Sequence, residues 1–228
     1  MEARIAKTQK QAQTGGDKVA KMQYEVLCRI KEALDHGKPA RSVVIDTPDE
    51  QKFARELFLL TSKPVLYVCN VDDASAVTGN KYTEQVRKAA EAEGAGMMIV
   101  SARTESEIAE LDTAEERKEF LEEMGLEESG ADRLIRAAYN LLDLQTYFTA
   151  GADECRAWTF VRGTKAPKAA GIIHTDFEKG FIRAEGIKYD DYVTLGSESA
   201  VRDAGKLGVE GKEYVVQDGD IMHFRFNV

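Results

Sequence analysis

Two apolar runs decide the fold of this chain: Pro64-Val-Leu-Tyr-Val-Cys69 and Met97-Met-Ile-Val100. A nearly continuous apolar run bounded by proline and asparagine is typical of a strand that is buried on both faces. Residues 82–93 lie between the runs and have the pattern of a helix that ends at Gly94. Strand, helix and strand in this order predict a parallel sheet with crossover helices, which is an α/β fold.

Residues 1–35, upstream of these strands, are predicted to be helical. Apolar residues recur at spacings of three and four in an otherwise charged segment, which predicts one apolar stripe. The stripe consists of Val19, Met22, Val26, Ile30 and Ala33. The break Thr14-Gly-Gly-Asp17 predicts a hairpin of two helices, with Asp17 capping the second. We expect an antiparallel coiled-coil arm over residues 1–40 rather than a membrane-binding helix, because the stripe lacks Trp and Phe and the polar face mixes both signs.

Further helices are predicted on both sides of the strands. Thr47-Pro-Asp-Glu50 is a capping box with proline at the first helical position, so a helix is expected from there to about Leu60. Two acidic helices are expected over 104–124 and 130–143. Together with the strands they would form one α/β domain over residues 41–144.

The pattern changes near Leu144 and predicts a second, α+β domain over residues 145–228 of the size of a β-grasp fold. We expect strands over 154–161 and 181–187, a helix that opens at Ala166-Pro167, and a hairpin of 213–217 with 220–226 around Asp218-Gly219.

Composition excludes several classes of protein. The 228 residues carry 40 Asp and Glu against 31 Lys and Arg, a net charge of −9, which disfavours a protein that coats nucleic acid by bulk charge. No run of about 18 apolar residues exists, and the charged start has no signal-peptide core. Three cysteines, far apart and odd in number, indicate a reducing cytoplasm and no zinc cluster. We therefore expect a cytoplasmic protein without a metal site and without a membrane or DNA partner.

Motifs of a complete enzyme are missing from the chain. It contains no GxxxxGK[ST] phosphate loop, no GxGxxG, no GxSxG and no HExxH. No catalytic residue is therefore assigned.

The informative polar residues follow the two buried strands. The first strand ends in Asn70-Val-Asp-Asp73 and the second in Ser101-Ala-Arg103. Ligands of open parallel sheets bind at the carboxyl ends of strands, so both loops should face one crevice. Asn-x-x-Asp followed one βα unit later by Ser-Ala is the spacing by which P-loop GTPases hold a purine ring. The alternative is that Asn and Asp stand there for turn geometry alone. The predicted base-binding residues are Asn70, Val71, Asp73, Ser101 and Ala102.

A family resemblance is carried by several stretches. They are Tyr147-Phe-Thr-Ala-Gly151, Arg156-Ala-Trp-Thr159, Ala166-Pro-Lys-Ala-Ala170, residues 173–184 and residues 216–228. Together they resemble the end of the Obg-like ATPases of the YchF type, which close with a TGS domain, a β-grasp module of translation-linked proteins. The resemblance covers essentially the whole chain. It implies ATP hydrolysis coupled to ribosome binding, a coiled-coil arm over 1–40, the second half of a nucleotide domain over 41–144 and a TGS domain over 145–228.

Two departures from the family pattern matter. Family members begin with a P-loop, switch regions and a DxxG element, and this sequence lacks them. The chain therefore resembles the C-terminal portion of such a protein, with ATP or GTP and Mg²⁺ expected only in the complete protein and no hydrolysis by this chain alone. The family motif NxxE, which favours ATP over GTP, here has Asp73 in place of Glu, so the base preference stays open.

The expected partner is the ribosome or its RNA, contacted through the TGS domain and the arm. The basic residues predicted to make this contact are Lys165, Lys168, Lys179 and Arg183, and Lys188 and Arg225 could belong to the same basic face. Scattered solubilising charge is the alternative reading of these residues. A rival function is a TGS-bearing ribosome or RNA adaptor without nucleotide activity. A TGS-bearing synthetase or alarmone enzyme is disfavoured, because no part of those catalytic domains is visible.

Overall fold

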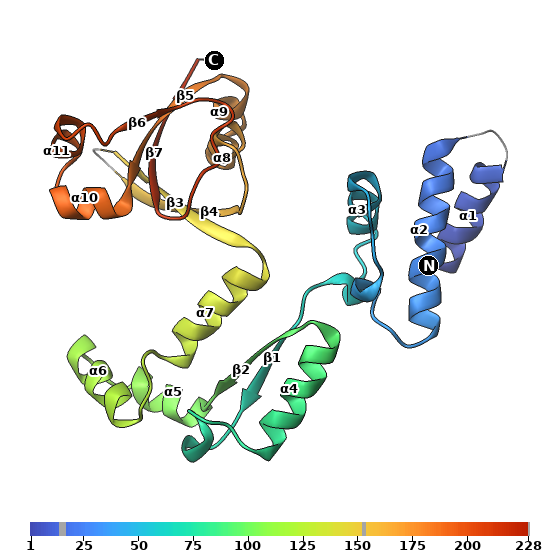
Figure 1. The fold of residues 1–228 in the computed structure, drawn as a ribbon, viewed down its shortest axis with the longest axis horizontal. Helices are drawn as coiled ribbons and strands as arrows, with labels where there is room; N and C mark the ends of the chain where they lie inside the picture. The colour runs from blue at the N-terminus through green and yellow to red at the C-terminus, as the bar shows by residue number, and fades with distance from the viewer. Residues whose placement is uncertain (14–16, 152–153, 228) are drawn as a thin grey trace. The chain divides into compact units, whose positions relative to one another are not determined.

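The computed structural model describes residues 1–13, 17–151 and 154–227, and these divide into two compact units, Met1–Ala131 and Asp132–Val228 (Figure 1). The first unit holds α1 (Glu2–Gln13), α2 (Lys18–Asp35), α3 (Pro48–Arg55), β1 (Leu66–Asn70), α4 (Lys81–Glu93), β2 (Gly96–Val100), α5 (Ala102–Ala109) and α6 (Ala114–Glu123). The chain passes into the second unit inside α7 (Gly130–Leu141).

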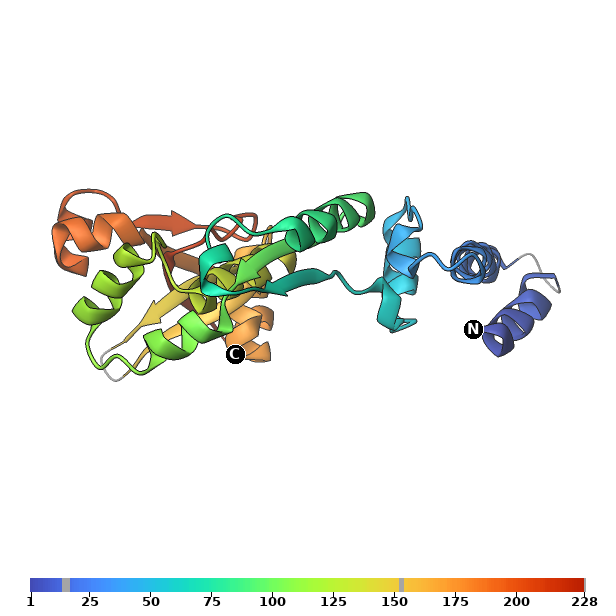
Figure 2. The ribbon, with the colours of Figure 1, turned by 90° about the horizontal axis from the view of Figure 1, so that it is seen from below.

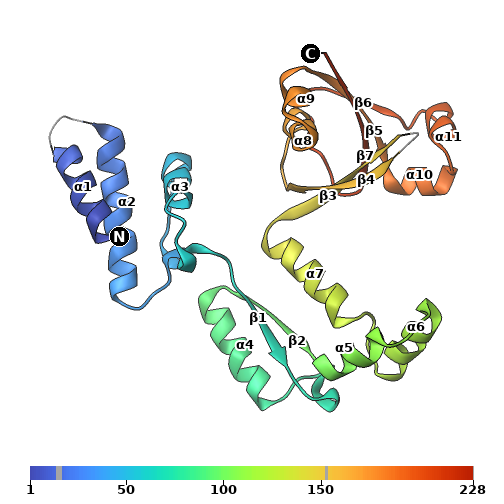
Figure 3. The ribbon, with the colours of Figure 1, turned by 180° about the vertical axis from the view of Figure 1, so that it is seen from behind.

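Helices α1 and α2 form an antiparallel hairpin (Figures 1 and 3). The Asp17 carboxylate caps α2 by accepting from the backbone N–H groups of Val19 and Ala20 at 2.9 and 3.1 Å, as the sequence predicts. The break itself, at residues 14–16, lies outside the described residues. Val26 and Ile30 are buried, whereas Val19 is 58% exposed and lies off the buried face.

The apolar face of α2 packs on the segment that follows it. Leu27 and Ile30 share a core with Ala40 and with Phe53 of α3. Thr47 and Glu50 form the predicted capping box of α3, but this helix ends at Arg55 and not near Leu60. The reason is the backbone at Phe58, whose φ of +50° is left-handed and incompatible with a continuing helix. The prediction of a longer helix was wrong.

Strands β1 and β2 pair in parallel from Leu66 opposite Gly96 to Asn70 opposite Val100, with α4 as the crossover (Figures 1 and 2). An Asn80 capping box begins α4, and Gly94, at φ +64°, ends it in the left-handed conformation. Parallel pairing with a crossover helix confirms the predicted α/β rhythm.

Burial of these strands on both faces was predicted, and that prediction was wrong. Val68 is 46% exposed, and all five residues of β2 are only half-buried. The physical reason is the size of the sheet: among the described residues β1 and β2 pair with each other and with no third strand.

The acidic region that follows β2 contains one more helix than predicted. The expected helix over 104–124 is interrupted at residues 110–113 and forms α5 and α6. A third capping box, in which Thr113 and Glu116 bond each other's backbone N–H, begins α6 and explains the break.

The second unit is built on a five-stranded sheet with the order β4-β3-β7-β5-β6. Its strands are β3 (Leu144–Ala150), β4 (Cys155–Val161), β5 (Phe181–Lys188), β6 (Gly208–Glu210) and β7 (Asp220–Phe226). Its helices are α8 (Ala166–Ile173), α9 (Thr175–Lys179), α10 (Tyr189–Leu195) and α11 (Glu198–Asp203), with α8 and α9 on the opposite side of the sheet from α10 and α11 (Figures 1 and 3).

Strand β7 occupies the centre of this sheet, parallel to β3 and antiparallel to β5. The predicted hairpin of 213–217 with 220–226 was therefore wrong. Residues 213–217 form no strand, and only Val215 makes an isolated bridge, to Lys165. The buried carboxylate of Asp220 accepts from the N–H of Gln217 and the hydroxyl of Tyr214, which turns this segment back without strand pairing.

The core of the second unit lies between the sheet and α8. Tyr147 is fully buried and donates its hydroxyl to the carbonyl of Ala169 at 2.9 Å. Phe160 is buried beside it, with ring centroids 5.7 Å apart. Small residues on α8 let the helix approach these rings closely: Ala166, Ala169 and Ala170, all fully buried.

Candidate functional site

The loops that follow β1 and β2 are joined by a side-chain bond. Asn70 is the last residue of β1, and its Oδ1 accepts a hydrogen bond from the backbone N–H of Ala102 at 3.0 Å. Val71 adds a backbone bond, from its N–H to the carbonyl of Val100 at 2.9 Å. The two strand tips therefore lie side by side, as the sequence predicts for the carboxyl edge of a parallel sheet.

Asp73 makes a second connection between the same loops. Its Oδ1 accepts from the hydroxyl of Ser101 at 2.6 Å and from the hydroxyl of Thr104 at 2.9 Å. Ser101 also caps α5 by accepting from the N–H of Thr104 at 3.2 Å. Ser101 and Thr104 are 2% and 1% exposed, so their hydroxyls depend on this network for partners.

The charge at this edge is balanced by one arginine. Arg103 Nε lies 3.6 Å from Asp73 Oδ2 and donates to Glu107 Oε1 at 3.1 Å. The Ser101 and Thr104 hydroxyls, with the Arg103 charge, hold the pKa of the Asp73 carboxyl below its usual value, although partial burial opposes them. Asp73 is therefore ionised at neutral pH and fixed from three sides.

All five predicted base-binding residues gather at this edge, which we call the shelf: Asn70, Val71, Asp73, Ser101 and Ala102. Asn70 and Ala102 are exposed, Val71 and Asp73 are half-buried, and Ser101 is buried. Asn70 and Ala102 can therefore be reached by a ligand, and the Ala102 N–H and Asn70 Oδ1 are already bonded to each other. Thr104 was missed in the sequence, because the helix was predicted to begin at residue 104, whereas α5 begins at Ala102 and places Thr104 at N3 after the Ser101 cap.

The basic residues predicted to contact RNA come from separate elements of the second unit. Lys165 lies 2.5 Å from Glu213, and Lys168 lies 2.5 Å from Glu178. Arg183 pairs with Glu185 at 3.4 Å. Lys179 has no ion pair with another described residue. Three of the four predicted basic side chains are therefore paired with a nearby carboxylate.

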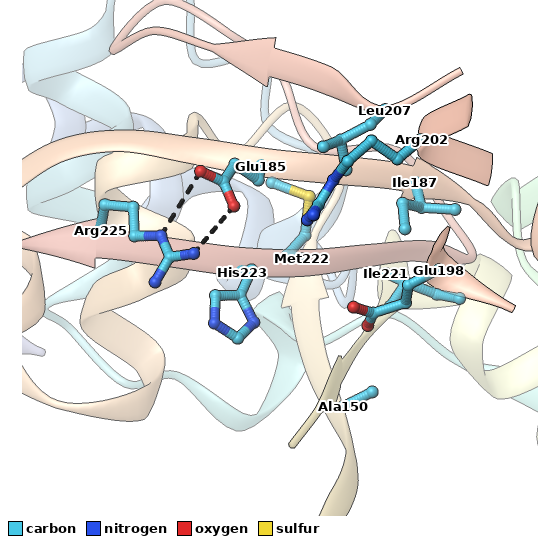
Figure 4. Close-up of a pocket in the computed structure, with 10 residues that line it drawn as sticks. All are labelled: Ala150, Glu185, Ile187, Glu198, Arg202, Leu207, Ile221, Met222, His223 and Arg225. Carbon is cyan, nitrogen blue, oxygen red and sulfur yellow. Dashed lines mark hydrogen bonds and ion pairs between the residues drawn. The ribbon is translucent and has the colours of Figure 1, made fainter. Parts of the chain in front are cut away.

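A pocket lies on the sheet face that carries Glu185, His223 and Arg225, beside Arg202 of α11 (Figure 4). Arg225 bonds Glu185 through Nη2 at 3.0 Å and Nε at 3.5 Å. The pocket has a volume of about 60 Å³, which corresponds to roughly two water molecules.

In the described ranges 1–13, 17–151 and 154–227, His, Cys, Asp and Glu side chains form no group of three or more that could hold a metal ion. None of the helices described there combines the length and apolar character needed to cross a bilayer.

Comparison with known proteins gives matches along the whole chain. A protein-family model described as "YchF-GTPase_C: Protein of unknown function (DUF933)" matches residues 144–227. The "Ribosome-binding ATPase YchF" of Bacillus subtilis (strain 168) is 53% identical over 230 residues, which cover 100% of this chain and 62% of the relative. The "Obg-like ATPase 1" of Homo sapiens is 41% identical over 227 residues, 98% of this chain and 57% of the relative.

Solved structures agree with these matches. The "Structure of the Schizosaccharomyces pombe YchF GTPase" has a TM-score of 0.84 at 33% identity, over 98% of this chain and 61% of that one. A "GTP binding protein from Pyrococcus horikoshii OT3" shares the fold, with a TM-score of 0.52 at 18% identity. The chain spans about three-fifths of the length of the curated relatives it matches. These matches confirm the resemblance seen in the sequence: the chain is a homologue of the C-terminal portion of the YchF-type Obg-like ATPases.

Proposed function

We propose that this chain supplies the purine-base shelf and the ribosome-docking surfaces of a YchF-type ATPase. The observation that carries the proposal is the bond from the Ala102 N–H to Asn70 Oδ1, which joins both strand-tip loops into one surface on which Asn70 and Ala102 are exposed. Most affinity for a nucleotide comes from its phosphates, so hydrolysis belongs to the complete protein and not to this chain alone. The relatives named as ATPases favour ATP as the ligand, with GTP as the alternative.

Three parts would share this work: a coiled-coil arm over 1–40, half of a nucleotide domain over 41–144 and a β-grasp TGS domain over 145–228. The antiparallel pair α1 and α2 supports the first assignment. The mixed five-stranded sheet with α8 packed on it supports the last. Mg²⁺ would accompany the phosphates. We assign it no residue here, because Asp72 accepts from the Ser75 N–H and Asp73 from two hydroxyls.

Ribosomal RNA is the proposed partner of the arm as well as of the TGS domain, which places the protein in the cytoplasm. The half of the hairpin nearest the break, residues 7–13 and 17–21, contains a single acid, Asp17, whose carboxylate caps α2. All its lysines are exposed, and we call them the tip lysines: Lys7, Lys10, Lys18 and Lys21. In a chain of net charge −9, this local excess of positive charge suits a phosphate backbone.

Calorimetric titration with ATP and GTP tests the nucleotide role. The chain is titrated alone and after co-expression with the N-terminal part of a bacterial relative, which has no counterpart in this chain. Weak or absent binding by the chain alone and tight, Mg²⁺-dependent binding by the complex is the expected result. Equal binding in both preparations would refute the assignment of the phosphate contacts to the missing part.

The adaptor alternative is separated by ribosome co-sedimentation of the same two preparations. An ATPase should bind ribosomes with an affinity that depends on the nucleotide added. Co-sedimentation that no nucleotide alters, in either preparation, would favour an adaptor without nucleotide activity.

A further inference from the structure

One oxygen of the Asp73 carboxylate already accepts two hydrogen bonds from within the protein. The hydroxyls of Ser101 and Thr104 lie 2.6 and 2.9 Å from Oδ1. A carboxylate offers about four acceptor positions, two on each oxygen, so these hydroxyls fill Oδ1. Both donors are buried, and loss of Asp73 would leave them without this acceptor.

The other oxygen faces a cation. Asp73 Oδ2 lies 3.6 Å from Arg103 Nε, and Arg103 is itself held by Glu107. Guanine presents two neighbouring donors, N1–H and the amino group on C2, and a carboxylate that reads guanine must offer both oxygens to them. Asp73 has only one oxygen left, beside a guanidinium that competes for it.

We propose that Asp73 is a positioning residue, which holds the Ser101-Ala102 segment against Asn70 and does not read the purine. The inference rests on the proposed nucleotide function and refines the role of one residue of the shelf. Contact with the base then falls to the two exposed residues, Asn70 and Ala102. The hydroxyl of Thr104 becomes a determinant of the site, because it occupies the second position on Oδ1.

Asparagine at this position separates the two roles. The Asp73→Asn variant keeps a carbonyl oxygen that can accept from both hydroxyls, but it replaces the other oxygen with an amide donor. If Asp73 read the base, this change would lower the affinity for guanine and raise the affinity for xanthine, whose C2 oxygen accepts from an amide. A positioning Asp73 would leave the order of preference unchanged, and only Asp73→Ala would lower the affinity for every purine.

The experiment titrates the co-expressed complex of this chain and the N-terminal part of a bacterial relative with ATP, GTP and XTP, and measures each affinity by calorimetry. For Asp73→Asn we expect relative affinities within about twofold of the wild-type order, and for Asp73→Ala a loss of at least about fivefold for all three, as one hydrogen bond is worth about 1 kcal/mol. Asp72→Asn is the control for loss of charge in the same loop, because its side chain can still accept from the Ser75 N–H. A gain of XTP over GTP in Asp73→Asn would overturn the proposal.

A second arm needs no nucleotide. Amide hydrogen exchange at Thr104, whose N–H bonds Ser101, should be unchanged in Asp73→Asn and clearly faster in Asp73→Ala. Equal exchange in Asp73→Ala and wild type would overturn the positioning role, even if no purine binds. Failure of every purine to bind, with the exchange pattern as expected, would refute the nucleotide function and leave the role of Asp73 in the loop intact.

Discussion

The side chain of Asn70 and the backbone of Ala102, on loops separated by a whole βα unit, are joined by a 3.0 Å hydrogen bond. Asn70→Ala removes the acceptor, and one such bond is worth about 1 kcal/mol. We expect the Ala102 amide to exchange about fivefold faster and purine affinity to fall. Hydrogen-exchange NMR measures the first effect and nucleotide titration the second. Asn140→Ala, at an exposed position of α7, is the control and should change neither.

Acid should weaken the hydrogen bonds by which Asp73 holds the two loops of the shelf together. The hydroxyl of Ser101, then that of Thr104, lowers the pKa of the Asp73 carboxyl from its ordinary 3.8. Since the pKa in the folded protein lies below that in the unfolded chain, the ionised carboxylate stabilises the fold fully above about pH 4, and this contribution is lost as pH falls through the lower, folded pKa.

Titration of Asp73 by NMR checks this prediction. Thr104→Val removes one of the two donors and should move the pKa of Asp73 back toward its ordinary value. An unchanged titration in this variant would show that the hydroxyl of Thr104 does not stabilise the carboxylate.

Replacement of Lys188, which pairs with the buried carboxylate of Asp220, should lower the free energy of unfolding more than replacement of Lys206. Lys188 Nζ lies 2.6 Å from Asp220, whose side chain is only 2% exposed. Lys188→Met leaves that charge with two neutral donors, and we expect a loss of about 2–3 kcal/mol in the free energy of unfolding. Lys206→Met breaks an exposed pair with Asp191 and should cost about 0–1 kcal/mol. Urea denaturation of both variants measures the difference, and equal costs would contradict it.

Two glycines of the second unit should differ sharply in their tolerance of alanine. A Cβ on Gly180 would stand 1.9 Å from the backbone oxygen of Asn227, whereas a Cβ on Gly211 would meet nothing within 4 Å. Gly180→Ala must therefore shift the segment after β7, and we expect a lower melting temperature. Gly211→Ala should melt at or above the wild-type temperature, since it restricts the unfolded chain. Calorimetry measures both melting temperatures, and an unchanged value for Gly180→Ala would contradict the close approach of Gly180 to the Asn227 backbone.

Ribosome binding should depend on the tip lysines through charge. Replacement of Lys7, Lys18 and Lys21 by glutamine should weaken co-sedimentation and lower the salt slope by roughly 0.7–0.9 for each phosphate that the arm no longer neutralises. The matched control replaces three exposed lysines elsewhere, Lys88, Lys118 and Lys212. An equal effect of both triple variants would show that net charge alone, and not the hairpin tip, governs binding.

The local signals in the sequence were reliable guides to helices and crossovers. Asp17 and Thr47 begin helices and Gly94 ends one, as their residue types predict, because a cap depends on neighbours within a few positions. The convergence of Asn70 and Ser101 followed from strand order alone.

Strand pairing and burial that depend on distant segments could not be predicted in the same way. The Asp218-Gly219 turn favours a hairpin, yet β7 pairs with β3 and β5, because two full strands bury its alternating side chains better than residues 213–217 could. The exposure of Val68 depends on how many strands complete the sheet, which no property of β1 itself encodes. Asp73 was assigned to the base from the Asn-x-x-Asp spacing, and its bonds to Ser101 and Thr104 could not be predicted because these residues lie on another loop.

The position of β7 has a consequence for synthesis. This strand follows β3, β4, β5 and β6 in the chain, yet it lies between β3 and β5 in the sheet. While the polypeptide is being made, the β3–β4 and β5–β6 pairs must wait as separate halves with open edges, exposed to wrong pairing. Folding of this unit is therefore gated by emergence of its final strand, and a nascent chain stalled before Asp220 should be a preferred client for chaperones.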